Sequence, residues 1–357
     1  MEKNFGKVAA TSWRPAGEPQ ATCRPGAHNS RYSSTGVGFE NPIAHLSSVY
    51  QHFTTFSVAR AGAHAHTSMT ELEQKIEKSI ALIKKGEKTA LRYQDYGYNV
   101  AFSGGKDSQV IAQLAKMAGV KYRMVHNMTT MDAPETMNFI KTNYPECIIR
   151  RPRRSFWQLC VDHKMLPTML MRFCCKELKE KSDPGAVTIT GVRHQESMRR
   201  ANREEVVLMT RRRHPDFVGG SYDEFEQHQQ VEVQCLRGLD KLVINPILEW
   251  SENDVWDFLH DNNIPTCSLY QRKRRIGCLF CPIQTTRGIW QDVREYPKHY
   301  YAFIKMIHRI RQARIQDKGY DHWGDLSDEE VFAWYASKKS FEEFYAERKM
   351  PSLFDNH

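Results

Sequence analysis

The stretch from Asn99 to Lys116 constrains the fold more than any other part of this 357-residue chain. It consists of a short apolar run ending at Phe102, a polar glycine-rich turn, and an apolar periodicity typical of a helix. The turn, residues 103–108, has the sequence Ser-Gly-Gly-Lys-Asp-Ser. Its glycines let the backbone approach a ligand closely, and the following helix directs amide groups and a positive dipole toward it. The pattern therefore predicts a cradle for a phosphate chain.

The spacing within this turn differs from the Walker pattern and from the Rossmann Gly-x-Gly-x-x-Gly pattern. An ordinary strand-to-helix turn is the alternative, although such turns seldom need this sequence. Lys106 adds a positive charge to the cradle, and we expect it to act in catalysis together with Asp107 and with Arg193, which lies further along the chain. The predicted nucleotide-binding residues of the turn are Ser103, Gly104, Gly105, Lys106, Asp107 and Ser108.

Composition limits the class of protein. A charged fraction of 26% and the lack of any apolar run of about 18 residues indicate a soluble globular chain without a membrane span. No signal peptide is evident, so the nine cysteines favour a reducing cytoplasm in which thiols serve metals or catalysis. The net charge of +9 favours anionic partners, although it is equally compatible with a merely soluble basic surface.

The chain divides into three predicted regions. Residues 1–68 are rich in Ser, Gly, Pro and His without periodicity, which predicts a disordered leader. In residues 69–250, apolar runs and helical patterns alternate, which predicts a doubly wound parallel α/β sheet that binds nucleotide. Residues 251–357 are predicted to form a C-terminal helical region that contains a Cys-x-x-Cys knuckle. The predicted strands are 98–102, 121–126, 146–150, 186–191 and a return to the sheet at 242–248.

Helix starts are marked by capping patterns. Asp132-Ala-Pro-Glu135 predicts a helix with Asp132 as its N-cap, and Ser251 and Ser327 begin capping boxes. The polar, arginine-rich stretch 196–239 is predicted to be an excursion that carries loops.

Four cysteines form the second candidate site: Cys174, Cys175, Cys278 and Cys281. A Cys-x-x-Cys knuckle flanked by Gly and Pro suits two thiolates on one metal. Adjacent cysteines must diverge, which an iron–sulfur cluster accommodates better than a single zinc ion does. A cluster is favoured over zinc, and unligated core cysteines or a redox pair remain alternatives. Cys147, Cys160 and Cys235 are predicted to be core residues, and Cys267 remains an open candidate.

Arg193 follows the predicted fourth strand and is expected at the same sheet edge as the glycine-rich turn. A guanidinium there suits a phosphate or sulfate, with Glu196 orienting it, and a helix-start salt bridge is the alternative. Thr129 and Thr130, at the end of the second strand, are candidate nucleotide contacts. Basic runs at 150–154, 211–213 and 272–275 are candidate contacts for nucleic-acid phosphates, or simply solvated surface.

Taken in order, these motifs resemble the phosphoadenosine phosphosulfate reductase family of the adenine-nucleotide α-hydrolase-like superfamily. The resemblance covers roughly residues 95–290 and rests on segments 103–108, 132–136, 191–197, 246–256 and 264–270. It implies an adenine nucleotide, ATP or adenylyl sulfate, bound by the turn, with Arg193 near its phosphate or sulfate end. The four cysteines resemble the four-iron, four-sulfur ligands of the adenylyl-sulfate-reducing branch. A similar set occurs in the sulfur-transfer protein of bacterial DNA phosphorothioation.

One departure from this family separates the possible reactions. The sulfonucleotide reductases share a C-terminal Glu-Cys-Gly motif whose cysteine attacks sulfur, whereas the last cysteine here is Cys281. We therefore expect cleavage of ATP between its α and β phosphates, with adenylation and sulfur transfer and with Mg²⁺ on the phosphates. The acceptor is a nucleic acid (DNA or tRNA) in this hypothesis, and a sulfur-donor protein is a further partner. The alternatives are a reductase that releases sulfite and a non-catalytic nucleotide or nucleic-acid sensor.

Overall fold

A computed structural model describes residues 69–180, 182–210, 217–228 and 241–349. The predicted leader at 1–68, the basic run at 211–213 and Cys235 lie outside the described residues. The division of the described part at residue 250 stays a prediction.

Seven strands in the described part of the chain form one sheet with the order β3-β2-β1-β4-β7-β5-β6. The strands are β1 (Tyr98–Ala101), β2 (Tyr122–Asn127), β3 (Ile148–Arg150), β4 (Val187–Ile189), β5 (Val206–Met209), β6 (Gly219–Gly220) and β7 (Lys241–Ile244). Neighbours among β3, β2, β1, β4 and β7 are parallel, whereas β5 runs antiparallel to both β7 and β6. The predicted α/β fold is confirmed, with an antiparallel edge that the sequence did not indicate.

The chain order reverses next to β1, which lies between β2 and β4. From β1 the chain proceeds outward to β2 and β3, and it returns to the other side of β1 as β4. Such a reversal leaves a crevice at the carboxyl ends of the two central strands, where open α/β sheets bind their ligands. The glycine-rich turn follows β1 at this point.

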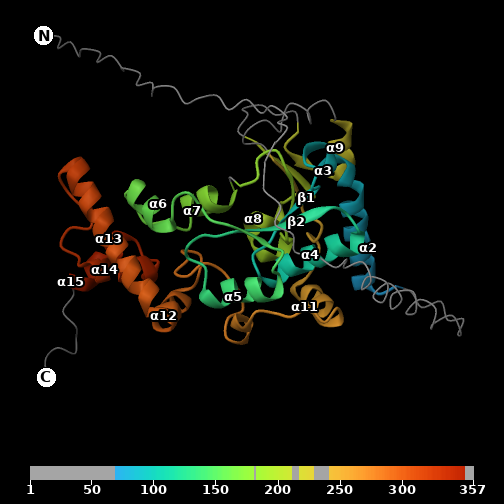
Figure 1. Ribbon diagram of the computed structural model, residues 1–357. Coiled ribbons are helices and arrows are strands. Elements are labelled where there is room, and N and C mark those ends of the chain that lie inside the picture. Colours follow the sequence, from blue (N-terminus) through green and yellow to red (C-terminus); the bar gives the residue numbers. More distant parts are fainter. Residues whose placement is uncertain (1–68, 181, 211–216, 229–240, 350–357) are drawn as a thin grey trace, which may run out of the picture. The chain divides into compact units, whose positions relative to one another are not determined.

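Helix α4 (Lys106–Ala118) begins within the turn, at Lys106, and packs against α2 (Glu71–Lys85) and α11 (Glu252–Asp261) (Figure 1). The α11 capping box is confirmed, because Ser251 Oγ accepts from the Asp254 N–H at 3.0 Å and Asp254 Oδ2 accepts from the Ser251 N–H. Apolar side chains from the sheet, α2, α4 and α11 share one buried core.

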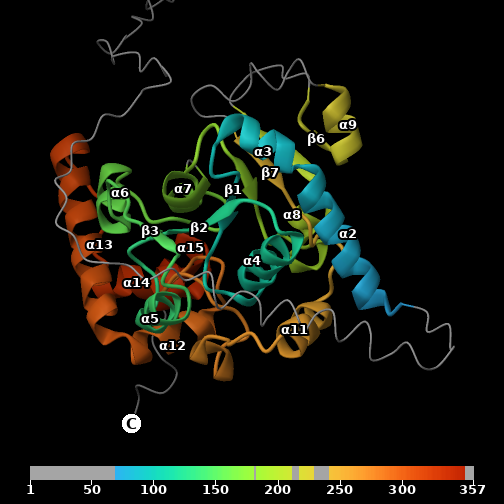
Figure 2. The same cartoon turned by 45° about the vertical axis from the view of Figure 1, so that its right-hand side comes forward.

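The described helices from residue 286 onward gather on one side, away from α2 and α11, in both views (Figures 1 and 2). They are α12 (Thr286–Glu295), α13 (Pro297–Lys318), α14 (Asp328–Ser337) and α15 (Phe341–Lys349). The predicted capping box at Ser327 is confirmed at the start of α14. These helices form a second core together with α6 (Phe156–Asp162), which precedes the paired cysteines in the sequence. The second core therefore joins the cysteine segment to the C-terminal helices.

The remaining elements are short. They are α3 (Glu87–Tyr93), α5 (Pro134–Asn143), α7 (Phe173–Cys175), α8 (Met198–Ala201), α9 (Tyr222–Gln227), the π-helix η2 (Lys176–Glu180) and the 3₁₀ helices η3 (His194–Glu196) and η4 (Ser268–Gln271). The predicted loop excursion at 196–239 thus also holds α8, β5, β6 and α9. Of the helices described, none combines the length and apolar character that a membrane crossing requires.

One predicted cap is wrong. The N-cap of α5 is Ala133, because Pro134 occupies the first helical position and supplies no N–H. The Asp132 carboxylate accepts instead from the Thr129 N–H at 2.7 Å, so it closes the turn that follows β2.

Candidate functional site

The glycine-rich turn has the predicted conformation of a strand-to-helix cradle. Gly104 has a φ of 73°, which favours glycine because a side chain strains this left-handed backbone. A Cβ at Gly104 would also lie 2.9 Å from Ile140 of α5. The turn is closed internally, since Ser108 Oγ donates to the Gly105 carbonyl at 2.7 Å and accepts from the Ser103 N–H at 3.1 Å. The turn is therefore shaped before any ligand arrives.

Arg193 is brought to the same sheet edge, as predicted, where its side chain donates to Asp107 and, at 3.4 Å, to the Trp250 carbonyl. Arg193 Nε donates to Asp107 Oδ1 at 2.6 Å, and the Arg193 side chain is only 4% exposed. Glu196 accepts from the backbone N–H of Arg193 and pairs with the Arg200 guanidinium. The Arg193–Asp107 pair joins the segments after β4 and β1, so it spans the crevice at the sheet reversal.

The ammonium group of Lys106 lies among carboxylates and is not free in solvent. Lys106 is 5% exposed, and its Nζ lies 3.2 Å from Asp107 Oδ2 and 3.9 Å from Glu252 Oε1. Two cations and two carboxylates thus share the crevice: Lys106, Arg193, Asp107 and Glu252. An anionic ligand that binds here would contact the Lys106 and Arg193 side chains, whose positions are fixed by their carboxylate partners.

Tyr270 of η4 reaches the start of α4. Its hydroxyl accepts from the Lys106 N–H at 2.7 Å, and burial raises the pKa of this phenol. The hydroxyl therefore accepts the hydrogen bond of one of the first amide groups of the helix, which a phosphate oxygen would otherwise accept. The residue lies in the segment 264–270 on which the family resemblance rests, yet the sequence alone gave no sign of this contact.

The four predicted cysteines come from two segments that the structure brings together. Cys174 and Cys175 lie in α7, and Cys278 belongs to a loop that pairs with the turn after β2. Cys278 Sγ lies 3.4 Å from Thr129 Oγ1, and the Leu279 N–H donates to the Met131 carbonyl at 2.7 Å. Thr129 Oγ1 accepts from the Met131 N–H at 3.2 Å, and Thr130 Oγ1 accepts from the Phe156 N–H at 3.0 Å, so both hydroxyls have backbone partners in this region.

Mutual proximity shifts the pKa values of these thiols. The hydrogen bond between Cys174 and Cys175 raises the pKa of Cys174 and lowers that of Cys175 to about 6. Burial raises the pKa of Cys281 to about 11, and the charges of Cys278 and Cys175 add to that effect. The same thiols raise the pKa of Lys179, with Cys278 acting most strongly. All four cysteines are free of disulfides and half-buried.

Among the residues that the structure describes, no group of three or more His, Cys, Asp or Glu side chains is arranged to hold a metal ion. Cys147, Cys160 and Cys267 are buried, which confirms Cys147 and Cys160 as core residues and places Cys267 in the second core.

The model for the phosphoadenosine phosphosulfate reductase domain family matches residues 97–284. An uncharacterized protein of Methanocaldococcus jannaschii is 26% identical over 267 residues, covering 71% of this chain and 58% of the relative. The chain spans 43% of a second relative from that organism. An adenosine 5'-phosphosulfate reductase of Oceanobacillus iheyensis is 23% identical over 212 residues, covering 54% of this chain and 75% of the relative.

A solved structure of phosphoadenylyl-sulfate reductase from Candida auris, a phosphate complex, is 14% identical with a TM-score of 0.34. The alignment covers 60% of this chain and 98% of that chain.

Proposed function

Because the chain belongs to the phosphoadenosine phosphosulfate reductase domain family, we propose that it is an enzyme that cleaves ATP between the α and β phosphates. The adenylyl group passes to an acceptor oxygen, which prepares that position for displacement by sulfur. The observation that carries this proposal is the preformed turn 103–108 at the carboxyl end of β1, beside the reversal of strand order.

The residues of the turn bind and orient the triphosphate. The amides at the start of α4 and the Lys106 ammonium face the β and γ phosphates, where negative charge accumulates as pyrophosphate departs. The acceptor oxygen attacks the α phosphorus, and the bond from that phosphorus to the bridging oxygen breaks. Arg193, held by Asp107, stabilises charge at the far end of the phosphate chain. When bound, Mg²⁺ would neutralise negative charge on the phosphates.

The cysteine site supports a metal group as a second part of the proposal. Four reduced thiols interact with one another, and the Lys179 ammonium lies near enough to offset thiolate charge. Cys174 and Cys175 are adjacent in α7, and neighbouring cysteines must diverge, which a cluster with several iron atoms accommodates better than a single zinc ion does. Cys174, Cys175, Cys278 and Cys281 would hold a four-iron, four-sulfur cluster. When bound, such a cluster supplies electron transfer or positively polarised iron near the substrate.

Pyrophosphate release tests the nucleotidyl-transfer proposal. The purified protein is incubated with ATP, Mg²⁺ and candidate acceptors, and pyrophosphate is measured over time. Lys106→Ala should lower the rate at least tenfold, because one donor to developing charge is commonly worth about 100-fold. Lys116→Ala, at an exposed lysine on the same helix, is the matched control. An unchanged rate in Lys106→Ala would contradict the proposal.

A sulfonucleotide reductase is the second candidate, because one of the relatives is named an adenosine 5'-phosphosulfate reductase. Such a reductase would use an unconventional thiol or a partner's thiol for the attack on sulfur. Sulfite release from adenylyl sulfate in the presence of a thiol donor would favour this candidate. Nucleotide binding without either product would favour the sensor.

A further inference from the structure

The two basic runs that the structure describes, 150–154 and 272–275, differ in how far carboxylates already neutralise their charge. Within the run 272–275, three side chains pair with carboxylates: Arg272 with Glu135 and Glu295, Lys273 with Asp292 and Glu295, and Arg274 with Glu252. The run 211–213 lies outside the described residues. The run 150–154, by contrast, contains arginine side chains that no described carboxylate neutralises.

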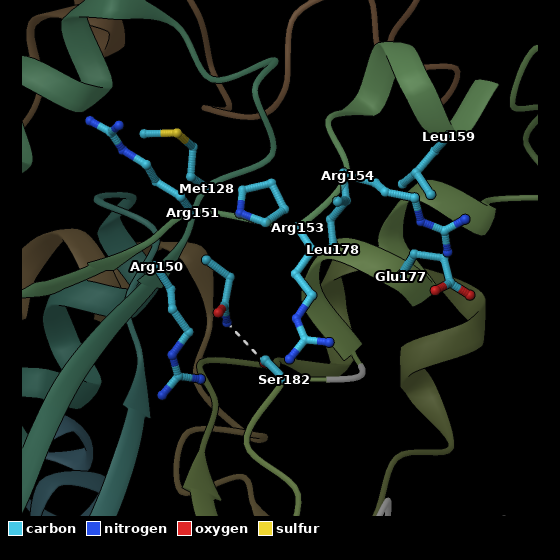
Figure 3. Close-up of a pocket in the computed structure, with 11 residues that line it drawn as sticks. Met128, Arg150, Arg151, Arg153, Arg154, Leu159, Glu177, Leu178 and Ser182 are labelled. Carbon is cyan, nitrogen blue, oxygen red and sulfur yellow. Dashed lines mark hydrogen bonds between the residues drawn. The ribbon is translucent and has the colours of Figure 1, made fainter. Parts of the chain in front are cut away.

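A cleft of about 540 Å³ opens beside this run at the end of β3 (Figure 3). Its lining includes all four arginines of the run, of which Arg150 pairs with Asp183 and Arg154 pairs with Asp162. Arg151 and Arg153 are exposed, and neither has an ion pair or hydrogen bond within the described chain. Two guanidinium groups are thus available to an anion.

The opposite wall of the cleft belongs to the cysteine segment. Leu178 and Ser182, which follow Cys174 and Cys175 in the sequence, line this wall. Asn127, at the end of β2, donates to Ser182 Oγ at 2.9 Å, and Ser182 Oγ donates to the Lys179 carbonyl at 2.7 Å. A ligand in the cleft would therefore lie between the β3 edge and the segment that directly follows the paired cysteines.

The sheet also fixes where the cleft lies relative to the glycine-rich turn 103–108. Strands β3, β2 and β1 are parallel neighbours, so the run 150–154 and the turn 103–108 follow the same edge of the sheet. β1 and β3 are separated by two strand spacings, a distance of about 10 Å. A chain-like ligand in the cleft can extend from there to the nucleotide, whereas a small ion cannot.

We propose that this cleft binds the sugar-phosphate backbone of a polynucleotide, which is the acceptor substrate. The guanidinium groups spread in different directions around the cleft, with Arg151 directed away from Arg150 and Arg153 (Figure 3). This spread suits successive phosphates along a chain better than one enclosed anion, and the guanidinium fork suits phosphate oxygens. The acceptor role rests on the proposed nucleotidyl transfer, whereas the binding is measurable without ATP.

The test is equilibrium binding of labelled single-stranded oligonucleotides of mixed sequence, one RNA and one DNA, followed by fluorescence anisotropy. The wild-type protein should bind at least one of them, more weakly as salt rises from about 50 to about 200 mM. The variant R151Q/R153Q should bind about tenfold or more weakly at low salt. Its slope of log K against log salt should fall by about 1.4, or about 0.7 for each lost phosphate contact.

The control R287Q/R309Q removes two exposed arginines that lie outside the cleft lining and have no ion pair with any residue that the structure describes; it should keep wild-type affinity and slope. Preference for RNA or for DNA supports the proposal and identifies the acceptor class. Equal losses in both double variants, or unchanged binding in R151Q/R153Q, would overturn it. If polyglutamate binds as tightly as the oligonucleotides, the proposal is overturned, and the cleft is a site for an acidic protein instead. ATP binding by the wild-type protein is measured separately. If ATP binds and the oligonucleotides do not, the proposal for the cleft has failed and the proposal for the nucleotide site has not.

Discussion

Arg193 Nε donates a hydrogen bond to Asp107 Oδ1 at 2.6 Å, across 86 residues of sequence. The contact joins the second residue of α4 to the segment after β4. Gly191 makes the approach possible, because a Cβ there would lie 2.8 Å from the Asp107 carbonyl oxygen. The two strands beside the sheet reversal are thus linked through charged side chains at the point where the phosphate chain is proposed to bind.

Removal of either partner of this pair should destabilise the protein. Arg193 is nearly buried whereas Asp107 is 20% exposed, so Asp107→Ala should cost about 2 to 3 kcal/mol in the free energy of unfolding. Arg193→Ala should cost a similar amount, and the double variant less than the sum. Denaturant unfolding of all three variants measures the coupling. Asp257→Ala, at an exposed position, should change stability by less than about 0.5 kcal/mol, and strictly additive losses would contradict the linkage.

Tyr270→Phe should bind ATP more tightly than the wild-type protein. The Tyr270 hydroxyl competes with phosphate for the Lys106 N–H, so its removal should raise ATP affinity about fivefold, equivalent to about 1 kcal/mol. Calorimetry measures this affinity. Tyr144→Phe is the matched control, since Tyr144 accepts from Gln109 Nε2 and leaves the turn amides untouched. An unchanged affinity in Tyr270→Phe would mean that phosphate does not use this amide.

Iron and acid-labile sulfide should co-purify with the protein when it is isolated without oxygen. Cys174→Ser and Cys278→Ser should lose most of both, because each removes a proposed ligand from a different segment. Cys147→Ala, at a buried cysteine of the sheet core, should retain them. Elemental analysis and visible absorption give the readout. A protein that contains one zinc per chain and no sulfide would contradict the cluster.

Acid should weaken the fold through His126. Burial lowers the pKa of this imidazole, whose Nδ1 lies 3.0 Å from the Phe102 carbonyl oxygen just before the turn. The unfolded state therefore binds the proton more readily, so stability is greatest above about pH 6.5 and falls as pH drops toward the folded pKa. The loss should approach about 1.4 kcal/mol per pH unit.

His126→Gln should show a flatter dependence of unfolding free energy on pH between about 7 and about 5. His260→Gln, at a histidine whose side chain is 92% exposed, should keep the wild-type slope. Equal slopes in wild type and His126→Gln would show that another group controls the acid sensitivity.

Local sequence determined what could be predicted of the fold. The turn 103–108, the strands around it and the capping boxes at Ser251 and Ser327 depend on neighbouring residues, and all were predicted correctly. The N-cap of α5 was predicted wrongly because the Thr129 amide, only three residues away, competes for the same carboxylate. Strands β5 and β6 were missed because their residues lie in a polar stretch, and pairing with β7 decides their conformation.

The charged contacts of the site could not be predicted in the same way. Arg193 and Cys278 were identified as candidates by type and position, but their partners lie 86 and 149 residues away. Tyr270 and Glu252 approach Lys106 only because η4 and α11 pack beside α4. Sequence patterns report which chemical groups are present, whereas tertiary packing decides which of them neutralise each other.

The segment 268–281 contacts both candidate sites. Tyr270 contacts the nucleotide turn at one end, and Cys278 contacts the turn after β2 near the other. A ligand that displaces the Tyr270 hydroxyl therefore acts on the same short stretch of backbone that positions a thiol. Thermodynamic linkage is reciprocal. If a change of state of the thiols alters the nucleotide affinity by some factor, nucleotide binding alters the equilibrium constant of that change by the same factor.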